Sequence, residues 1–314
     1  MEIDITNALP AGHELRQYRI VRPLGGGGFS IVYLAHDTAQ NRPVVIKEYL
    51  PGNQAKRAED VSVQSLSAET NATFRQGIKR FFEEAAVLAK IRHESIVQVI
   101  DFFRDNNTVY IVMQHEEGKD LRWYVKRYGR LPEKFIRSVF TGVLLGLREL
   151  HAHHLLHLDI KPANIFLRPG GKPLLLDFGA AQPAYRENRV QAPHTLTLGY
   201  APIEQHRRGH LGPWTDLYAI GASIWTCMSG KAPLPATRRA ERDALKPAAK
   251  KFARHYSRPL LEAVDWCLRV DQLERPQNVQ QLLDFLAREP APETEPPAGL
   301  LGRLGLSWLA KRAG

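Results

Sequence analysis

The sequence has little cysteine and no long apolar run. Its 314 residues include only 2 cysteines, Cys227 and Cys267, which are too few and too far apart for a disulfide framework or a zinc knuckle. We expect both to pack inside helices. No stretch reaches the roughly 18 apolar residues of a membrane-spanning helix, and residues 1–10 lack the features of a signal peptide. These absences lead us to expect a soluble protein in a reducing, cytoplasmic setting.

Acidic residues are outnumbered by basic ones, which gives a formal net charge of +10. A basic surface can attract nucleic acid, anionic lipid or acidic protein segments without specifying any of them. Aromatic residues are sparse in the basic stretch 238–259, which argues against a stacking platform for nucleic acid. We therefore expect a solvated, helical basic surface there and no specific nucleic-acid partner.

The pattern of apolar residues changes from strand-like to helical along the chain. Residues 18–50 alternate as short antiparallel strands do, 68–92 carry apolar residues at steps of three and four, and 107–114 read as a buried strand. Most of the remainder is helical in pattern. Residues 51–70 have weak periodicity and predict either an extended loop or a short extra hairpin. The fold class is therefore α+β, with a β-rich part before a larger helical part.

The C-terminal end of the sequence differs in composition from the rest. Residues 289–299 are rich in proline and glutamate and predict an extended linker. Residues 300–314 place Leu301, Leu304 and Trp308 on one helical face. Three alternatives stay open for this last segment: an unattached tail, docking on the folded domain, or contact with an anionic membrane surface.

One apolar stretch, "LLHLDIKPANIFL", contains three polar residues that suggest chemistry. Asp159, Lys161 and Asn164 lie between the leucines at the start of this stretch and the apolar residues at its end. In phosphoryl transfer an aspartate orients the attacking hydroxyl, a lysine neutralises charge on the moving phosphoryl, and an amide oxygen helps to hold magnesium. Read alone, the segment could equally be a polar turn between two strands.

Further motifs accompany this segment in a fixed order. They are "LGGGGFSIV" (24–32), "VVIK" (44–47), "FFEEAAVLAKIRH" (81–93), "LLLDFGAA" (174–181) and "TLGYAPIEQ" (197–205). Together with the Asp159 segment they resemble the serine/threonine protein kinases, in particular bacterial members of that family, over residues 18–288. The resemblance implies a bilobal fold with an N-lobe at 18–114 and a C-lobe at 117–288, after an N-terminal extension at 1–17.

The resemblance also implies an activity and its substrates. The expected reaction transfers the γ-phosphoryl group of ATP to Ser or Thr hydroxyls of proteins, with the chain itself as one candidate substrate. Asp159 is the expected base and Lys161 its partner, while Asn164 and Asp177 are the expected ligands of Mg²⁺, with Mn²⁺ as the alternative ion. The lysine two positions after Asp159 is similar to the serine/threonine pattern, so tyrosine specificity is not expected.

The nucleotide-binding residues follow from the same resemblance. The glycine-rich loop that covers the phosphates corresponds to Gly25, Gly27, Ser30 and Val32. Lys47 is expected to contact the α- and β-phosphates.

The partner of Lys47 on the following helix is expected to be Glu84, with Glu83 as the rival one position away. The backbone of Gln114 and Glu116 is expected to bind the adenine edge, and Asp120 the ribose.

Two motifs point to a protein substrate. "TLGYAPIEQ" resembles the end of an activation segment, with Thr195 as a phosphorylation candidate and Thr197 near the catalytic aspartate. Glu204 is expected to pair with Arg275, and Asp216 is expected to support the catalytic loop. The sequence departs from the family where Pro202-Ile203-Glu204 replaces the usual Ala-Pro-Glu.

A second departure concerns Leu158. The family commonly has an arginine there that clamps a phosphate on the activation loop. Leucine cannot do this, so we hypothesise that activity does not need phosphorylation of Thr195, unless Arg186 or Arg189 replaces the clamp.

The sequence is also compatible with two other functions and with one additional metal site. A pseudokinase that binds ATP as an interaction module is disfavoured because Lys47, Glu84, Asp159, Asn164 and Asp177 are all present. A small-molecule phosphotransferase is disfavoured by the activation-segment motifs. A metal site at His153 and His157, four residues apart, is less favoured than a His157 that packs beside Phe178.

Overall fold

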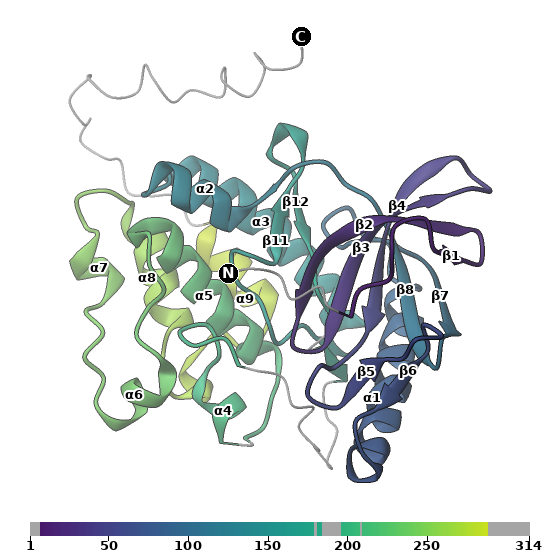
Figure 1. The fold of residues 1–314 in the computed structure, drawn as a ribbon. Coiled ribbons are helices and arrows are strands. Elements are labelled where there is room, and N and C mark those ends of the chain that lie inside the picture. The colour runs from purple at the N-terminus through teal and green to yellow at the C-terminus, as the bar shows by residue number, and fades with distance from the viewer. Residues whose placement is uncertain (1–6, 179–180, 184–195, 208, 288–314) are drawn as a thin grey trace. The chain divides into compact units, whose positions relative to one another are not determined.

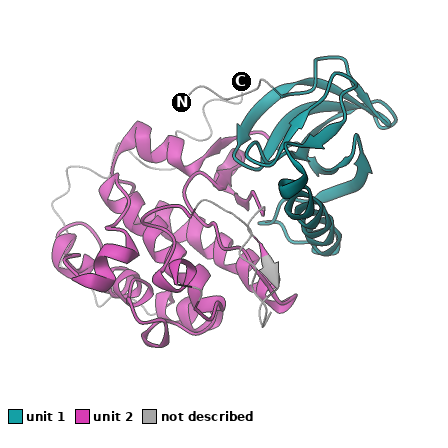
Figure 2. Ribbon diagram, turned by 60° about the horizontal axis from the view of Figure 1, so that its bottom comes forward, with its two compact units in different colours: residues 1–116, 191–195 teal, residues 117–190, 196–314 magenta. Residues whose placement is uncertain are grey.

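The structure is a computed structural model that describes residues 7–178, 181–183, 196–207 and 209–287 (Figure 1). Thr195, the linker 289–299 and the segment 300–314 lie outside the described residues, so predictions about them stay predictions. Contacts divide the chain into two compact units (Figure 2). The N-terminal unit comprises residues 1–116 with 191–195, and the C-terminal unit comprises 117–190 and 196–314.

The N-terminal unit is built on a six-stranded antiparallel sheet and one long helix. In spatial order its strands are β1 (Glu14–Leu15), β2 (Tyr18–Gly27), β3 (Ser30–Asp37), β4 (Arg42–Tyr49), β8 (Thr108–Gln114) and β7 (Val99–Asp105). In β3 every second residue is buried, which is the alternation that the sequence predicts. Asn106 and Asn107 both have positive φ, as a tight hairpin between β7 and β8 requires.

The helix of this unit, α1 (Ala68–Leu88), begins at a capping box and packs on the sheet through its apolar stripe. Ser67 accepts a hydrogen bond from the backbone of Thr70, and the Thr70 side chain bonds back to Ser67. The Tyr49 ring stacks against Phe74 and lies over Gly77, where a Cβ would collide with its hydroxyl. The predicted helix is confirmed, although it ends a turn earlier than expected.

The weakly periodic region 51–70 contains the extra hairpin, β5 (Ala55–Arg57) and β6 (Val63–Ser65). Arg57 reaches from this hairpin to Glu48 on β4, a carboxylate with 0% exposure that also accepts hydrogen bonds of 2.6 Å from Tyr33 and Tyr110. Arg57 Nε further donates to the carbonyl of Asn7 at 2.8 Å. The hairpin is therefore tied into the sheet through a buried ion pair.

The predicted N-terminal extension also contributes to this unit. Leu9 and Leu15 are each 1% exposed, and the Leu9 backbone N–H donates to Tyr33 Oη at 3.1 Å. Two isolated leucines make no periodic pattern, which is why the sequence did not reveal their role in the core.

The C-terminal unit is mainly helical. Its helices are α2 (Leu121–Tyr128), α3 (Glu133–Ala152), α4 (Ile203–His206), α5 (Pro213–Ser229), α6 (Ala236–Glu241), α7 (Ala248–Lys251), α8 (Arg258–Cys267) and α9 (Val279–Leu286), with 3-10 turns at Pro169–Gly171 and Gln272–Glu274. Nearly all of α5 is buried, as expected for a helix that is apolar all round. Cys227 and Cys267 are buried in α5 and α8, as predicted, and burial raises the pKa of the Cys267 thiol to about 12.

Short strands in this unit carry the candidate catalytic segments. β9 (Lys119–Asp120), β11 (Ile165–Leu167) and β12 (Pro173–Leu175) form a three-stranded sheet, and β10 (Leu155–Leu156) pairs with β13 (Gln182–Pro183). The basic stretch 238–259 is only partly solvated, because Arg239 is 6% exposed and pairs with Asp243 at 2.8 Å. In the described part of the chain, no helix has the length and apolar character needed to cross a bilayer.

Candidate active site

The loop that contains Asp159 is hydrogen-bonded to Asp216, a residue of α5 with 0% exposure. Its carboxylate accepts the backbone N–H of His157 at 2.9 Å and that of Leu158 at 2.8 Å. His151 Nε2 lies 2.9 Å from the same carboxylate. Burial alone would raise the pKa of Asp216, but the contacts with His151 and the loop backbone outweigh burial and hold the pKa below its usual value. Asp216 is therefore hydrogen-bonded to the loop that contains Asp159.

Asp159 is the centre of a hydrogen-bonded cluster. Lys161 Nζ lies 2.7 Å from Asp159 Oδ2 and 3.0 Å from Oδ1. Thr197 Oγ1 donates to Asp159 Oδ1 at 2.9 Å and accepts from Lys161 Nζ at 3.0 Å. Asn164 Nδ2 donates to Asp159 Oδ2 at 3.0 Å. The structure thus brings four of the predicted site residues together, with an alcohol hydroxyl on the candidate base.

Asn164 and Asp177 lie at the same end of the β11–β12 hairpin. Ile165 pairs with Leu175, so the residues just beyond this pair face each other, and the Leu176 N–H donates to the Asn164 carbonyl at 2.9 Å. Asn164 Nδ2 also donates to the Asp159 carbonyl at 2.8 Å, which fixes the orientation of the amide group. One carboxylate and one amide oxygen are the hard donors that Mg²⁺ prefers, so these two residues fit the predicted metal ion.

The residues around this hairpin are packed as the sequence predicts. The His157 ring lies 4.7 Å from the ring of Phe178, which is 4% exposed, and His157 Nε2 is 3.1 Å from the Leu176 carbonyl. Asp177 has a φ of 58° and an exposed side chain. The histidine is therefore engaged in packing, and Asp177 is directed away from the apolar core that holds its neighbour.

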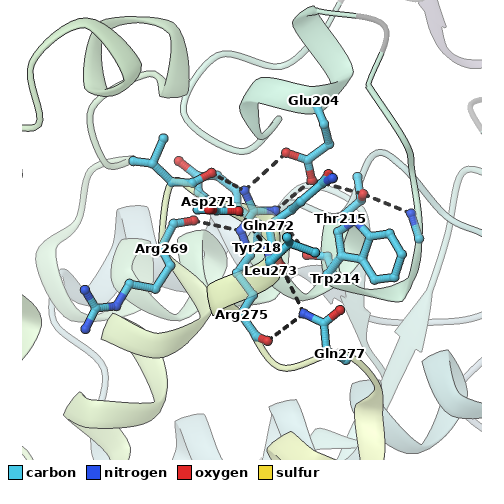
Figure 3. Close-up of polar contacts among 12 residues, drawn as sticks. Glu204, Trp214, Thr215, Tyr218, Arg269, Asp271, Gln272, Leu273, Arg275 and Gln277 are labelled. Atoms are coloured by element: carbon cyan, nitrogen blue, oxygen red, sulfur yellow. Dashed lines mark hydrogen bonds and ion pairs between the residues drawn. The ribbon is translucent and has the colours of Figure 1, made fainter.

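Glu204 and Arg275 form a buried ion pair (Figure 3). The distances from the guanidinium to the two carboxylate oxygens are 2.7 and 3.2 Å, and the residues are 5% and 2% exposed. Thr215 Oγ1 also donates to Glu204 at 3.1 Å, and Arg275 Nε donates to the Arg269 carbonyl at 2.7 Å. The pair anchors the segment that follows Thr197, and Pro202-Ile203-Glu204 does not prevent the ion pair from forming.

Strand register places the candidate phosphate-binding residues of the N-terminal unit side by side. Val32 pairs with Gly25 on one side and with Lys47 on the other, and Gly27 pairs with Ser30. A Cβ at Gly25 or Gly27 would meet nothing within 4 Å. The space beside the backbone at these two glycines is therefore open.

Lys47 points toward α1. Its side chain is buried, with Nζ 5.6 Å from the centre of the Phe81 ring. Glu84 follows Phe81 by three residues, so the two share a helix face, and Glu84 is partly buried. Glu83 is exposed and lies 3.9 Å from Lys79. This placement favours Glu84 over its rival as the partner of Lys47.

The residues predicted to bind adenine and ribose have structural roles that the sequence did not reveal. The Gln114 N–H donates to the Gln98 carbonyl at 3.0 Å, so a contact with adenine at Gln114 would use its carbonyl. Glu116 is the last residue of the first segment of the N-terminal unit, which is followed in sequence by the C-terminal unit. Asp120 Oδ1 accepts the Trp123 N–H at 2.7 Å and caps α2.

Sequence reasoning missed two residues that fix the loop. Gln205 Nε2 donates to the Leu158 carbonyl at 3.0 Å, and His151 binds Asp216. Gln205 directly follows the Glu204 anchor, and His151 lies on the helix that leads into the loop. Their positions beside known motifs were the only available signal.

Comparison with known proteins agrees with this geometry. A family model described as the protein kinase domain matches residues 18–285. The chain belongs to the protein kinase family. The serine/threonine-protein kinase PknA of Nostoc sp. is 32% identical over 228 residues, which are 69% of this chain and 38% of that protein. The kinase pkn2 of Myxococcus xanthus is 29% identical over 86% of this chain and 32% of its own length.

A solved structure supports the same fold. The apo form of PpkA-294 is similar with a TM-score of 0.78 and 31% identity, covering 89% of this chain and 99% of that chain. The predicted kinase fold is therefore confirmed. The chain spans about a third of the length of the curated relatives named above.

Proposed function

We propose that the protein is a serine/threonine protein kinase, which transfers the γ-phosphoryl group of ATP to Ser and Thr hydroxyls of proteins. The chain itself is one candidate substrate. The family membership and the names of the relatives support this activity. The observation that carries the proposal is the Thr197 hydroxyl on Asp159 Oδ1 at 2.9 Å, with Lys161 against both groups.

The arrangement suits in-line transfer to an alcohol. An acceptor hydroxyl would take the position of the Thr197 hydroxyl on Asp159, which orients it and accepts its proton as oxygen attacks the γ-phosphorus. The bond from that phosphorus to the β–γ bridging oxygen breaks, and ADP leaves. Lys161, 2.7 Å from Asp159, supplies positive charge near the transferred group. Positioning and electrostatics provide most of the acceleration.

The candidate binding groups for the phosphates and the metal ion fall into two sets. Asn164 and Asp177 would hold Mg²⁺ or Mn²⁺, and a bound ion would neutralise charge on the phosphates. In the N-terminal unit, Gly25, Gly27, Ser30 and Val32 would cover the phosphates, and Lys47 would bind them with Glu84 as its partner.

The nucleoside part of ATP has its own candidate contacts. The backbone of Gln114 and Glu116 would bind adenine. The carboxylate of Asp120 would have to bind ribose while it caps α2.

Radiolabel transfer from ATP and Mg²⁺ tests the proposal. The wild-type chain and Asp159→Asn are incubated with a generic basic protein, and mass spectrometry locates the phosphorylated residues. We expect phosphoserine and phosphothreonine with the wild type, and a loss of at least about 10²-fold in the variant because the base is removed. Asp60→Asn, on an exposed loop, is the matched control and should leave transfer unchanged.

The alternatives predict different outcomes. A pseudokinase would bind nucleotide, measured by calorimetry, without transfer to any acceptor. A small-molecule phosphotransferase would label sugars or aminoglycosides supplied side by side but not the protein acceptor. Either result would overturn the proposal.

Leu158 supports independence from activation-loop phosphorylation. It is 8% exposed, and its backbone is bonded to Asp216 and Gln205. Thr195, Arg186 and Arg189 lie outside the described residues. We expect Thr195→Ala to keep kcat within a few fold of wild type in steady-state assays. A collapse of turnover in a folded variant would instead mean that another cation binds a phosphate on Thr195.

A further inference from the structure

The outer side of α2 is an exposed aromatic surface. Trp123 and Tyr128 are 41% and 44% exposed, and their ring centres are 6.1 Å apart. Tyr124 lies 5.0 Å from Trp123 and joins them to the body of the unit. Exposed apolar patches that are rimmed by polar residues mark sites of interaction with other segments or proteins. This surface therefore has the chemistry of a docking site.

Positive charge surrounds these rings. Arg122, Lys126, Arg127 and Arg130 are all exposed. The helix α2, "LRWYVKRY", contains no acidic residue, although Arg122 pairs with the capping residue Asp120 at 3.2 Å. The four cations together with Trp123 and Tyr128 are here called the α2 face. An occupant should combine negative charge with rigid apolar groups that stack on aromatic rings.

A segment of the same chain has this composition. Residues 289–297, "EPAPETEPP", contain three glutamates, four prolines and no basic residue. Proline-rich segments bind aromatic surfaces at low entropic cost because their extended conformation is largely preformed. The glutamates are opposite in charge to the cations, and such complementary contacts favour one partner over others.

The described chain ends close to the α2 face. Arg137 Nη1 donates to the Leu286 carbonyl at 2.7 Å, which places the end of α9 against the first turns of α3. Phe135, on the same turns, lies 5.7 Å from the Tyr124 ring. Nine residues of extended polyproline conformation span about 28 Å. The segment is therefore long enough to cross the α2 face from its point of attachment.

We propose that residues 289–297 bind the α2 face of their own chain. The prolines stack on Trp123 and Tyr128, and the glutamates pair with the surrounding cations. The α2 face directly follows Asp120, so the bound segment borders the part of the chain where the predicted ribose contact lies.

Limited proteolysis of the full chain tests the proposal. A glutamate-specific protease has one readily cut bond in the segment, Glu293–Thr294, because Glu289 and Glu295 each precede proline. Cleavage is followed by intact mass, and each rate is divided by that of a matching synthetic peptide. In Trp123→Ala/Tyr128→Ala we expect cleavage at least about five-fold faster than in the wild type, since cleavage follows the undocked fraction.

Controls separate docking from a general loss of structure. Leu273→Ala removes a side chain that is 74% exposed elsewhere in the same unit and should leave the rate unchanged. Lys126→Glu/Arg127→Glu should accelerate cleavage, and adding Glu289→Lys/Glu295→Lys should restore protection. Rescue by charge exchange cannot result from unfolding. Equal rates in the wild type and the aromatic variant, or failure of this rescue, would overturn the proposal.

Two other occupants give distinct results. A cavity of about 340 Å³, lined by Ile136, Phe140 and Leu283 among others, lies beside the end of α9 and could hold the apolar residues of 300–314. Protection lost in Leu301→Ser/Leu304→Ser/Trp308→Ala, but kept in the α2 variants, would assign docking to that cavity and overturn the α2 proposal. Protection that disappears on dilution would place the segment on a second copy, which also contradicts binding within one chain.

Discussion

Glu48 and Asp216 are both completely buried carboxylates, yet they are stabilised in different ways. Asp216 is stabilised by His151 of α3 and by two backbone N–H groups of the loop it supports. Glu48 depends on Tyr33 and Tyr110 from β3 and β8, the two strands that flank β4, and on Arg57 from the β5–β6 hairpin. One carboxylate organises the segment that contains Asp159, and the other follows Lys47 directly in β4.

The difference lies in what each network requires of the sequence. Asp216 needs a helix residue and a loop that folds over it, and both belong to the family pattern. Glu48 needs Tyr33, Tyr110 and Arg57 at the same time. The proximity of Glu48 and burial raise the pKa of both tyrosines, with burial the larger cause. Loss of a single partner should therefore destabilise the protein more at Glu48 than at Asp216.

Of the predicted effects, the loss of stability in Arg57→Met should be the largest. Without the guanidinium, Glu48 becomes an uncompensated buried charge, and the free energy of unfolding should fall by about 3–5 kcal/mol. Urea denaturation measures the loss. Glu48→Gln/Arg57→Met should recover part of it, because the buried charge is removed together with its partner. A loss similar to that of an exposed control, Arg19→Met, would show that the ion pair is not needed.

Asp216→Asn should affect catalysis more than stability. The amide keeps one acceptor but cannot serve both loop N–H groups and His151, so the Asp159 loop should shift. We expect kcat to fall by roughly 10²-fold, the scale of a misplacement near 1 Å, with little change in the KM for ATP. Steady-state kinetics with both substrates varied measures this. A rise in the KM for ATP at constant kcat would contradict a role in positioning Asp159.

Motif order in the sequence predicted the network around Asp216 but not the network around Glu48. Asp216, Glu204 and Arg275 were identifiable because each stands at a fixed place among the motifs, and apolar periodicity revealed α1. Arg57 was not identifiable, because it lies in a region without periodicity and a charged residue there is expected to be solvated. The capping role of Asp120 was hidden for a related reason: a carboxylate before a helix has the same sequence pattern whether it caps or binds a ligand.

The smallest effect concerns acid sensitivity and separates the contribution of Asp216 from that of His206 on α4. Burial lowers the pKa of His206 from 6.5, so the unfolded state binds the proton first and stability declines as the pH falls below 6.5. The lowered pKa of Asp216 acts in a more acidic range: its contribution is present above about 3.8 and is lost as the pH falls through the folded-state value.

Equilibrium unfolding between pH 7 and about pH 3 resolves the two ranges, because the two groups titrate separately in the unfolded state. His206→Gln should remove the upper decline, and Asp216→Asn should reduce only the lower one, to which Glu133 and Asp243 also contribute through their lowered pKa values. If His206→Gln leaves the whole profile unchanged, that histidine is not the source of the upper decline.

The hairpin at 55–65 also sets a condition on how this chain can change through evolution. A short hairpin between two larger elements is usually the part of a fold that is lost most easily. Here its deletion would remove Arg57 and leave Glu48, fully buried, without its cation. A lineage could shorten this region only after, or together with, a substitution at Glu48. We therefore expect the β5–β6 hairpin and Glu48 to be inherited or lost together.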